Sequence, residues 1–318
     1  MAERQSTNHN FVITDVAQKT IAAYLRLART VRDLIPADLR KSVRISTPGR
    51  AYGRHLNALV RRAAKRRQGF GTFFLRNRPE LQLLCRLLEH EASGASVSIT
   101  VLGCSSGAEV YSVLWSIRSA RADLKLQTHA VDISEEILQF AERGTYPRRG
   151  RDASIFERMT DEEMESLFDV DDEQASVKPS LKEGIIWLAA DAGDSALAVA
   201  LAPQDIVLAN RFLCHMEPPA AERCLRNIAR LVKPGGYLFV SGVDVDVRTK
   251  IAREMGWRPV MELMREIHEG DPSLRKAWPS EYWGLEPFRS DRPDWKLRYA
   301  SVFQLGESGT ACALDPTT

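Results

Sequence analysis

The chain has 318 residues, of which 44% are hydrophobic and 27% are charged. This composition is that of a globular protein and excludes a wholly disordered chain. The length suits one large domain joined to a smaller one. No apolar run approaches the ~20 residues that span a bilayer, so we expect no membrane span.

The cysteine content and the N-terminal residues indicate the cellular compartment of the protein. The five cysteines are odd in number and form no short metal-ligand spacing, which indicates reduced, mostly buried thiols; they are Cys85, Cys104, Cys214, Cys224 and Cys312. Residues 1–32 lack the apolar core and the cleavage site of a signal peptide. We therefore expect a cytoplasmic protein.

The net charge of +2 hides an asymmetry along the chain. Residues 19–78 contain 16 Lys and Arg against two acids, so that this segment carries +14 and the remainder −12. A basic module of this kind suggests an acidic partner. The alternative, that the basic helices lie on acidic surface of the same protein, stays equally open.

The first elements in the chain are helical. Apolar residues recur at helical spacing over 12–34 and again over 52–67, and the second stretch ends in a strongly basic cluster. Between them, the Ser-Thr-Pro-Gly at 46–49 indicates a turn. We therefore expect a basic helical domain over residues 1–70.

From residue 79 the pattern changes to alternating helices and strands. Helices are expected at 79–90, 109–118, 134–143 and 220–231, and strands at 98–102, 128–131, 185–189, 205–209, 237–240 and 299–305. This alternation predicts an α/β domain over 71–306, with a doubly wound, mostly parallel sheet and helices on both faces. Residues 307–318 are expected to form a flexible tail.

A glycine turn follows the first strand. Residues 97–112 read VSITVLGCSSGAEVYS, with Gly103 and Gly107 in the turn. Glycine lets a ligand approach the backbone closely, and the next helix points its N-terminus at that ligand. Many α/β proteins have such a turn for packing alone, so it is a weak signal by itself.

Polar residues follow three further strands, at the sheet edge where α/β folds bind ligands. Asp132 can accept hydrogen bonds from ribose hydroxyls or cap the next helix, and Asp191 can contact an adenine amino group or form a turn. Asn210 and Arg211 follow the strand at 205–209. No phosphate-binding lysine loop is present, which argues against a nucleoside triphosphate.

The helix, Pro-Gly-Gly turn and strand of LVKPGGYLFVSG (231–242) are typical of class I methyltransferases. The sequence also resembles the CheR family, which methylates glutamate side chains of chemoreceptors. The segments that carry the resemblance are GTFFLRNRPELQLL (71–84), LGCSSGAEVYS (102–112), AVDISEEILQFAERGTYP (130–147) and DIVLANRFLCHM (205–216). It spans roughly residues 15–245.

The resemblance implies a seven-stranded Rossmann-like sheet, a small antiparallel insertion at 157–184, and S-adenosylmethionine as cofactor, with S-adenosylhomocysteine as product. It places Arg76 at the methionine part of the cofactor, Glu109 near its amino group, Asp132 at the ribose and Asp191 at the adenine. The full set of expected cofactor-binding residues is Thr72, Arg76, Gly103, Cys104, Ser105, Glu109, Asp132, Ile133, Asp191, Ala192 and Asn210.

The sequence departs from the family at residues 209–216. The family reads Cys-Arg-Asn-Val, two apolar residues and Tyr-Phe, whereas this chain reads ANRFLCHM. Arg and Asn are thus exchanged, and His215 stands where the family has its active-site tyrosine. The expected catalytic residues are His215, Arg76, Asn210 and Arg211. The alternative for His215 is a helix-start residue that faces solvent or packs beside Met216.

The acceptor stays open at this stage. Glutamate O-methylation follows from the resemblance, whereas His215 can act as a base for an amine or hydroxyl of a small molecule. A non-catalytic cofactor-binding module is a third alternative. We expect an acidic protein or a small molecule as acceptor, no nucleic acid and no metal. The aromatic segment at 278–303 either caps the sheet or forms a substrate wall.

Overall fold

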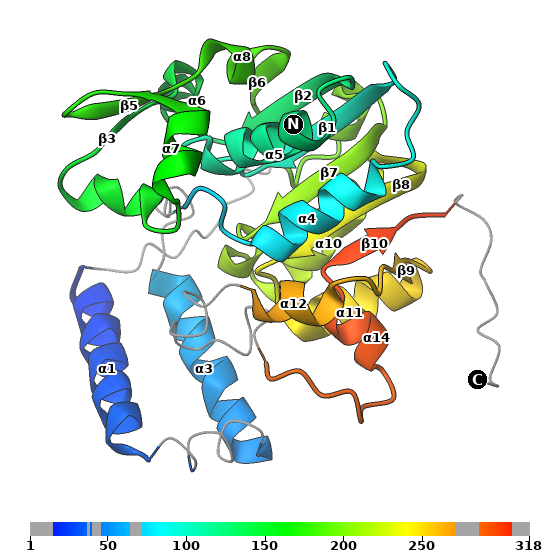
Figure 1. Ribbon diagram of the computed structural model, residues 1–318. Coiled ribbons are helices and arrows are strands. Elements are labelled where there is room, and N and C mark those ends of the chain that lie inside the picture. The colour runs from blue at the N-terminus through cyan, green and yellow to red at the C-terminus, as the bar shows by residue number, and fades with distance from the viewer. Residues whose placement is uncertain (1–14, 37–38, 40–45, 64–71, 271–285, 307–318) are drawn as a thin grey trace, which may run out of the picture. The chain divides into compact units, whose positions relative to one another are not determined.

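The computed structural model describes residues 15–36, 39, 46–63, 72–270 and 286–306 (Figure 1). The chain divides into two compact units, Met1–Lys65 and Arg66–Thr318. Among the described residues, no helix is both long and apolar enough to cross a membrane.

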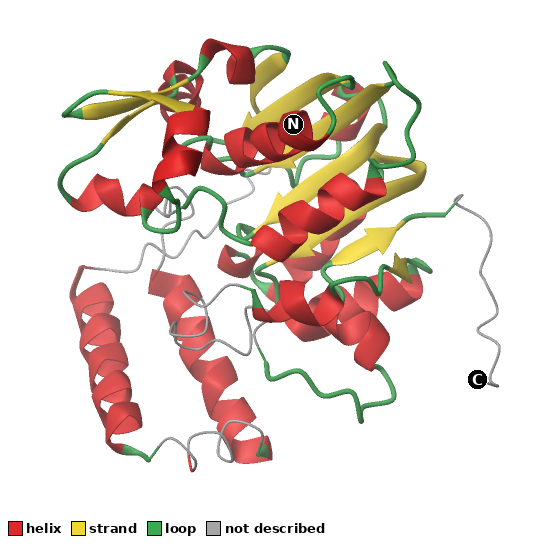
Figure 2. Ribbon diagram, in the orientation of Figure 1, coloured by secondary structure: helices red, strands yellow, loops and turns green. Residues whose placement is uncertain are grey.

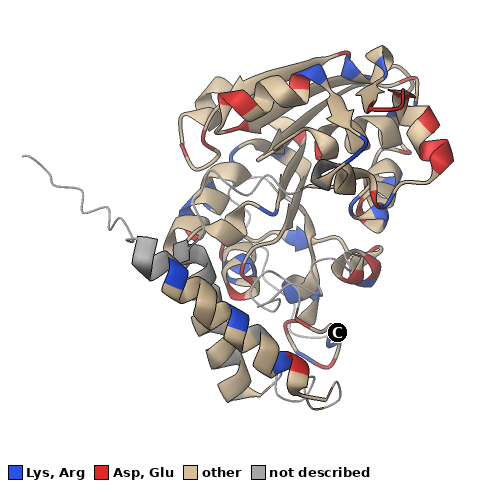
Figure 3. Cartoon of the chain, turned by 90° about the vertical axis from the view of Figure 1, so that its left-hand side faces the viewer, with Lys and Arg blue, Asp and Glu red and all other residues tan. Residues whose placement is uncertain are grey.

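The first unit is a pair of helices, α1 (Asp15–Leu34) and α3 (Thr47–Ala63). Ala28 and Leu56 are buried between them, and the ring of Tyr24 lies edge-on to that of His55 at 6.1 Å. The charged residues of α1, apart from those at its two ends, are basic (Figure 3). The basic side chains at 61–67 lie outside the described part of the chain.

The second unit is built on a seven-stranded sheet with the order β6-β2-β1-β7-β8-β10-β9 (Figure 1). Its strands are β1 (Ser96–Leu102), β2 (Lys125–Asp132), β6 (Ile185–Ala189), β7 (Gln204–Asn210), β8 (Val232–Ser241), β9 (Arg258–Pro259) and β10 (Val302–Gln304). Only β10 runs antiparallel to its neighbours, and the other pairs are parallel. The mostly parallel seven-stranded sheet expected from the sequence is confirmed.

Helices cover both faces of this sheet (Figure 2). One core packs side chains of α4, α5 and α6 against Ile99, Ile206 and Leu208. The other packs α9, α10 and α11 against Val207 and Ala209. Successive residues of β7 thus point to opposite faces, and both are apolar because both faces are covered. The helices are α4 (Arg78–Leu87), α5 (Ala108–Ala120), α6 (Glu135–Arg143), α9 (Leu197–Ala200), α10 (Pro218–Ala229) and α11 (Val245–Glu254).

A three-stranded antiparallel sheet with the order β3-β5-β4 is inserted between α6 and β6. Its elements are β3 (Thr145–Pro147), η1 (Arg151–Phe156), α7 (Asp161–Leu167), β4 (Phe168–Val170), β5 (Gln174–Val177) and α8 (Pro179–Lys182). The insertion therefore begins directly after α6, earlier than the expected 157. Its core is aromatic: Phe74, Tyr146, Phe156 and Phe168 pack edge-to-face or stacked.

Two local expectations need correction at the C-terminal side of the sheet. The Lys-Pro-Gly-Gly at 233–236 does not separate α10 from the strand but lies inside β8, where the register shifts against β7. The expected strand at 299–305 shortens to β10, because α14 (Trp295–Tyr299) takes its beginning. The element α12 (Met264–Glu269) lies nearby in the chain.

The described part of the aromatic segment packs onto the protein. Trp295 lies edge-on to Phe288 at 5.9 Å, and both pack against the buried core of α10 and α11. Arg298 forms an ion pair with the buried Glu286, which anchors α14 to this segment. Trp278 and Trp283 lie outside the described residues, so capping of the sheet is found for Trp295 alone.

Candidate functional site

One cavity lies at the carboxyl ends of β1, β2, β6 and β7. It encloses about 1200 Å³, its open mouth included, which is enough for a ligand of drug size. All thirteen residues that the sequence assigned to cofactor binding or catalysis line this cavity. Eight further residues that sequence reasoning missed also line it: Phe73, Asn77, Glu80, Leu81, Ser112, Ala190, Phe212 and Met216.

The glycine turn forms the floor of the cavity. Gly103 has a positive φ of 64°, and a Cβ there would lie 2.8 Å from the Phe212 ring, so no other residue fits without displacing that ring. Gly107, at φ 86°, is the N-cap residue of α5. Burial raises the pKa of the Cys104 thiol well above its ordinary value. Cys104 thus stays a neutral thiol at physiological pH.

Asp132 lies at the end of β2 and is 7% exposed. One carboxylate oxygen accepts the amide hydrogen of Ser105 at 2.9 Å, and the other accepts that of Ser134 at 3.2 Å. The helix α6 is capped by Ser134 itself. Because an ionised carboxylate has about four acceptor positions, Asp132 can hold the turn and still accept hydroxyl donors from a ligand.

Asp191 follows β6 and also has a local role. Its Oδ1 accepts the amide hydrogen of Gly193 at 2.8 Å, which makes a tight turn at the cavity edge. The neighbouring Ala192 and Ala190 are small and line the same edge. The turn interpretation of Asp191 is therefore seen directly, and its remaining acceptor positions lie beside the cavity.

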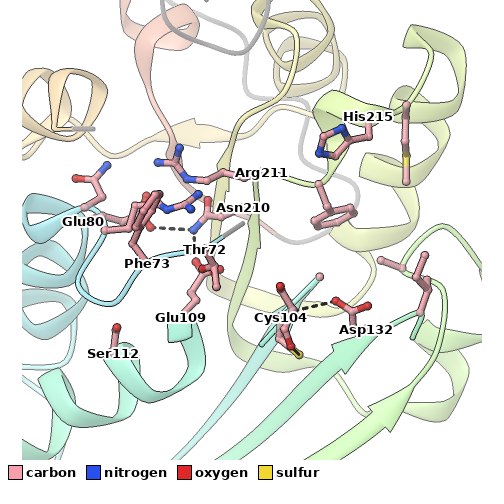
Figure 4. A pocket seen from close by; sticks show the side chains of 18 of the residues that line it. Thr72, Phe73, Glu80, Cys104, Glu109, Ser112, Asp132, Asn210, Arg211 and His215 are labelled. Carbon is pink, nitrogen blue, oxygen red and sulfur yellow. Dashed lines mark hydrogen bonds between the residues drawn. The ribbon is translucent and has the colours of Figure 1, made fainter. Parts of the chain in front are cut away.

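A buried polar network occupies the opposite side of the cavity (Figure 4). The Asn210 amide nitrogen donates to both Glu80, at 2.8 Å, and Glu109, at 2.6 Å. The Asn210 carbonyl accepts from the Ser241 hydroxyl at 2.7 Å. Two carboxylates from α4 and α5 thus meet at one amide from β7. Burial raises the pKa of Glu109, while the Asn210 hydrogen bond and the charges of Arg211 and Arg76 oppose that rise.

Arg211 adopts a positive φ of 68°, which is uncommon for a residue with a side chain. Its amide donates to the Ser241 carbonyl at 2.9 Å, and Gly242 lies against it so closely that a Cβ there would be 2.6 Å from its Cα. Arg76 lies over the Phe73 ring, with its guanidinium carbon 4.8 Å from the ring centre.

His215 lies in the single turn η2 (Leu213–His215) at the cavity mouth. Part of its ring is exposed there, and the desolvation of the rest lowers the pKa of its imidazole. The imidazole is therefore neutral at physiological pH. His215 is exposed and lies on the same side of the cavity as Asp132 and opposite Glu80 (Figure 4), so its catalytic role stays a prediction.

The missed residues are of two kinds. Phe73 lies in segment 71–84, which carries the family resemblance, so the signal that indicated Thr72 and Arg76 also indicates Phe73. Glu80 had no signal of its own, because an acid in the first turn of a helix is ordinary. Its importance depends on Asn210, which lies 130 residues away.

The donor and acceptor set fits S-adenosylmethionine. Carboxylates suit its ammonium group at the Glu109 side and its ribose hydroxyls at Asp132, while Ile133, Ala192 and Phe212 offer apolar surface to an adenine. The strand order with an antiparallel last strand and the glycine turn at the end of β1 define a class I methyltransferase fold.

A comparison with protein families identifies the family within this fold. The family model described as CheR methyltransferase, SAM binding domain, matches residues 71–251. The chain therefore belongs to the CheR family of S-adenosylmethionine-dependent methyltransferases, and S-adenosylmethionine is its cofactor. The resemblance expected from the sequence is confirmed.

Two curated relatives match part of the chain. The probable biofilm formation methyltransferase WspC of Pseudomonas putida is 26% identical over 197 residues, 60% of this chain and 44% of that protein. An uncharacterized 104.1 kDa protein of Rhodobacter capsulatus is 24% identical over 169 residues, 52% of this chain and 17% of that protein. The chain thus spans less than half the length of these relatives.

Solved structures of methyltransferases are similar in part. The N-methyltransferase NodS of Bradyrhizobium japonicum, in complex with S-adenosylhomocysteine, is 16% identical, with 57% of this chain and 76% of that chain covered and a TM-score of 0.32. The magnesium protoporphyrin IX methyltransferase ChlM of Synechocystis is 15% identical, with 57% and 71% covered and a TM-score of 0.34. These scores are low, and the fold assignment rests on the strand order.

Proposed function

We propose that this protein transfers a methyl group from S-adenosylmethionine to a carboxylate side chain of a protein, a glutamate as in the family. The observation that carries the proposal is the pair of guanidinium groups in the cavity. Arg76 and Arg211 both line it, and both act electrostatically on Glu109. Guanidinium groups are the preferred partners of carboxylates, so Arg76 can hold the carboxylate of the cofactor's methionine part and Arg211 can orient an acidic acceptor.

The chemistry needs little from the protein beyond alignment. When bound, the cofactor supplies a methyl group already activated on a sulfonium. The residues of the cavity would hold an acceptor oxygen beside that methyl group, so that the oxygen could take the methyl carbon while the electron pair of the carbon–sulfur bond stays on sulfur. Glu109 and Asp132 hold the ammonium and ribose ends of the cofactor, Arg76 holds the carboxylate of its methionine part, Arg211 orients the acceptor, and the cavity walls exclude water.

The individual roles follow from the environments. Glu109, kept in place by Asn210, is positioned for the ammonium group, and Asp132 for the ribose hydroxyls. The turn at Asp191 sits where an adenine amino group would be. Thr72 and Phe73 belong to the segment that lines the cavity with Arg76. An ionised carboxylate acceptor needs no base, so His215 would then contact the acceptor without removing a proton.

A second candidate is methylation of an amine or hydroxyl on a small molecule. The specific observation in its favour is His215, whose lowered pKa leaves a neutral imidazole able to accept a proton at the cavity mouth. This candidate uses the same cofactor site and differs only in the acceptor.

One experiment separates these candidates. The protein is incubated with methyl-labelled S-adenosylmethionine and a host lysate, and protein and small molecules are then separated. Label in protein that mild alkali releases as methanol supports a carboxyl ester. Alkali-stable label, or label in the small-molecule fraction, supports the second candidate. Binding of S-adenosylhomocysteine without any transfer would indicate a binding module and end both.

A further inference from the structure

The antiparallel insertion contacts residues 72–78, several of which line the cavity. The amide of Phe74 donates to the carbonyl of Ile155 at 3.0 Å, which joins the segment to η1. Leu75, with a positive φ of 50°, donates its amide to the Ser112 hydroxyl of α5 at 2.9 Å. Residues 72–78 are therefore held between the insertion on one side and α5 on the other.

Arg158 makes two of the contacts between the insertion and residues 72–78. It follows η1 in the insertion, and its side chain is 17% exposed. Its Nη1 donates to the carbonyl of Arg76 at 2.9 Å, and its guanidinium carbon lies 5.5 Å from the centre of the Phe73 ring. The same ring faces the guanidinium of Arg76 at 4.8 Å. Two cationic groups thus share one aromatic ring, one from the cavity wall and one from the insertion.

Arg78, in turn, donates hydrogen bonds from residues 72–78 to the insertion. Its Nη2 donates to the carbonyl of Arg158 at 2.6 Å and to Glu163 at 2.8 Å. Glu163 is the capping-box residue of α7, where it also accepts the Thr160 amide hydrogen at 2.9 Å. The backbone of Arg158 is therefore tied to the residue that starts α4, while its side chain is tied to the residue that lines the cavity.

We propose that Arg158 is a positioning residue that holds Arg76 and Phe73 at the cavity and thereby connects the antiparallel insertion to cofactor binding. Arg158 does not line the cavity, so it acts through Arg76. A hydrogen bond to the Arg76 carbonyl fixes the backbone from which the Arg76 side chain extends. The shared Phe73 ring limits the directions that its guanidinium can take. The inference rests on the proposed role of Arg76 at the methionine part of the cofactor.

The test compares two ligands that differ only in the methionine part. S-adenosylhomocysteine carries the amino-acid group, whereas 5′-methylthioadenosine has the same nucleoside and thioether without it. Binding of each is measured by calorimetry to wild type, Arg158→Ala, Arg76→Ala and the double variant. Arg148→Ala is the matched control, because Arg148 also donates to a backbone carbonyl of the insertion, that of Asp171, without touching residues 72–78.

We expect Arg158→Ala to weaken S-adenosylhomocysteine about tenfold, the usual scale for one hydrogen bond from a charged donor. Binding of 5′-methylthioadenosine should stay unchanged. Added to Arg76→Ala, the substitution should have no further effect, because the side chain through which Arg158 acts is gone. Arg158→Lys should restore part of the affinity, since an ammonium can donate to the carbonyl but lacks the planar face for the ring.

Three results would overturn the inference: equal losses for both ligands, effects of the two substitutions that add, or no loss in Arg158→Ala. If Arg158→Ala does not fold by circular dichroism, Arg158→Lys and Arg158→Gln give the same readouts. Failure of the wild type to bind S-adenosylhomocysteine would instead refute the proposed function, which keeps the two failures distinct.

Discussion

Asn210 offers the sharpest test of the cavity's electrostatics. Its amide nitrogen donates to both Glu80 and Glu109 and thus lies between these two carboxylates. Asn210→Ala removes both hydrogen bonds at once, together with the one that the Asn210 carbonyl accepts from the Ser241 hydroxyl. Glu80 and Glu109 then remain buried side by side without the donor that they share, so the cost falls on the folded state.

The size of the effect depends on pH, and its direction follows from Glu109. Burial already raises the pKa of Glu109 above its ordinary 4.5, and the Asn210 hydrogen bond opposes the rise. The substitution should raise that pKa further. A carboxyl group with a raised pKa in the folded state costs nothing below its ordinary pKa, and the cost grows as pH rises through the raised value. The destabilisation should therefore be larger in alkali than in acid.

We expect Asn210→Ala to lower the free energy of unfolding by about 3–6 kcal/mol near pH 8, because two hydrogen bonds to charged groups are lost, each worth about 1.5–3 kcal/mol. The loss should be smaller near pH 5, by about 1.4 kcal/mol for each unit by which the pKa of Glu109 rises further. Urea unfolding at both pH values measures this difference. Equal losses at the two pH values would refute the reasoning.

The matched control is Asn227→Ala. The Asn227 amide donates to the uncharged carbonyl of Gly193 at 2.8 Å, so its loss should be the same at both pH values. A pH dependence of the same size in this control would show that Glu109 is not the group responsible.

The remaining predictions concern ligand and acceptor. Asp132→Ala should weaken S-adenosylhomocysteine on the order of 1.5–3 kcal/mol for each ribose hydrogen bond lost, measured by calorimetry, and unchanged affinity would remove Asp132 from the site. His215→Phe should lower turnover ~10²–10⁴-fold if His215 is a base, and should abolish a rise in rate with pH whose midpoint lies below the ordinary 6.5 of histidine. Full activity with an unchanged pH profile would favour a carboxylate acceptor. Reversing Arg62, Arg66 and Arg67 to Glu should raise the KM for the acceptor and leave the Kd of the cofactor unchanged. The rise in KM should shrink with added salt, because salt screens charges beyond ~8–10 Å. A change in the cofactor Kd alone would indicate that the basic helices have a structural role and do not recognise the acceptor.

Much of the cofactor cavity was predictable from local sequence. Asp132, Asp191 and Asn210 each follow a buried strand, and the carboxyl ends of parallel strands meet at one edge of the sheet. Periodicity locates the strands, and the glycine turn marks which edge binds a ligand. Because these signals are local, residues far apart in the chain could be placed in one cavity before any contact was known.

The polar pairings within that cavity were not predictable in the same way. Glu80 has an ordinary position in the first turn of α4, and only the packing of α4 and α5 beside β7 brings it to Asn210 and Glu109. The exchange of Arg and Asn at 210–211 was visible in the sequence. That the exchange lets one amide bridge two carboxylates depends on distances between three elements.

The sequence by itself determined the alternation of strands and helices, because burial on both faces requires apolar strands at regular intervals, and it indicated the edge of the sheet at which a ligand binds. The order of the strands came from the tertiary structure. Only the tertiary structure decided that the insertion begins directly after α6, that Trp295 packs onto the core, and that Arg158 reaches Arg76 across 82 residues. Such contacts join surfaces of separate elements, and their energy depends on how those elements pack rather than on any pattern within one of them.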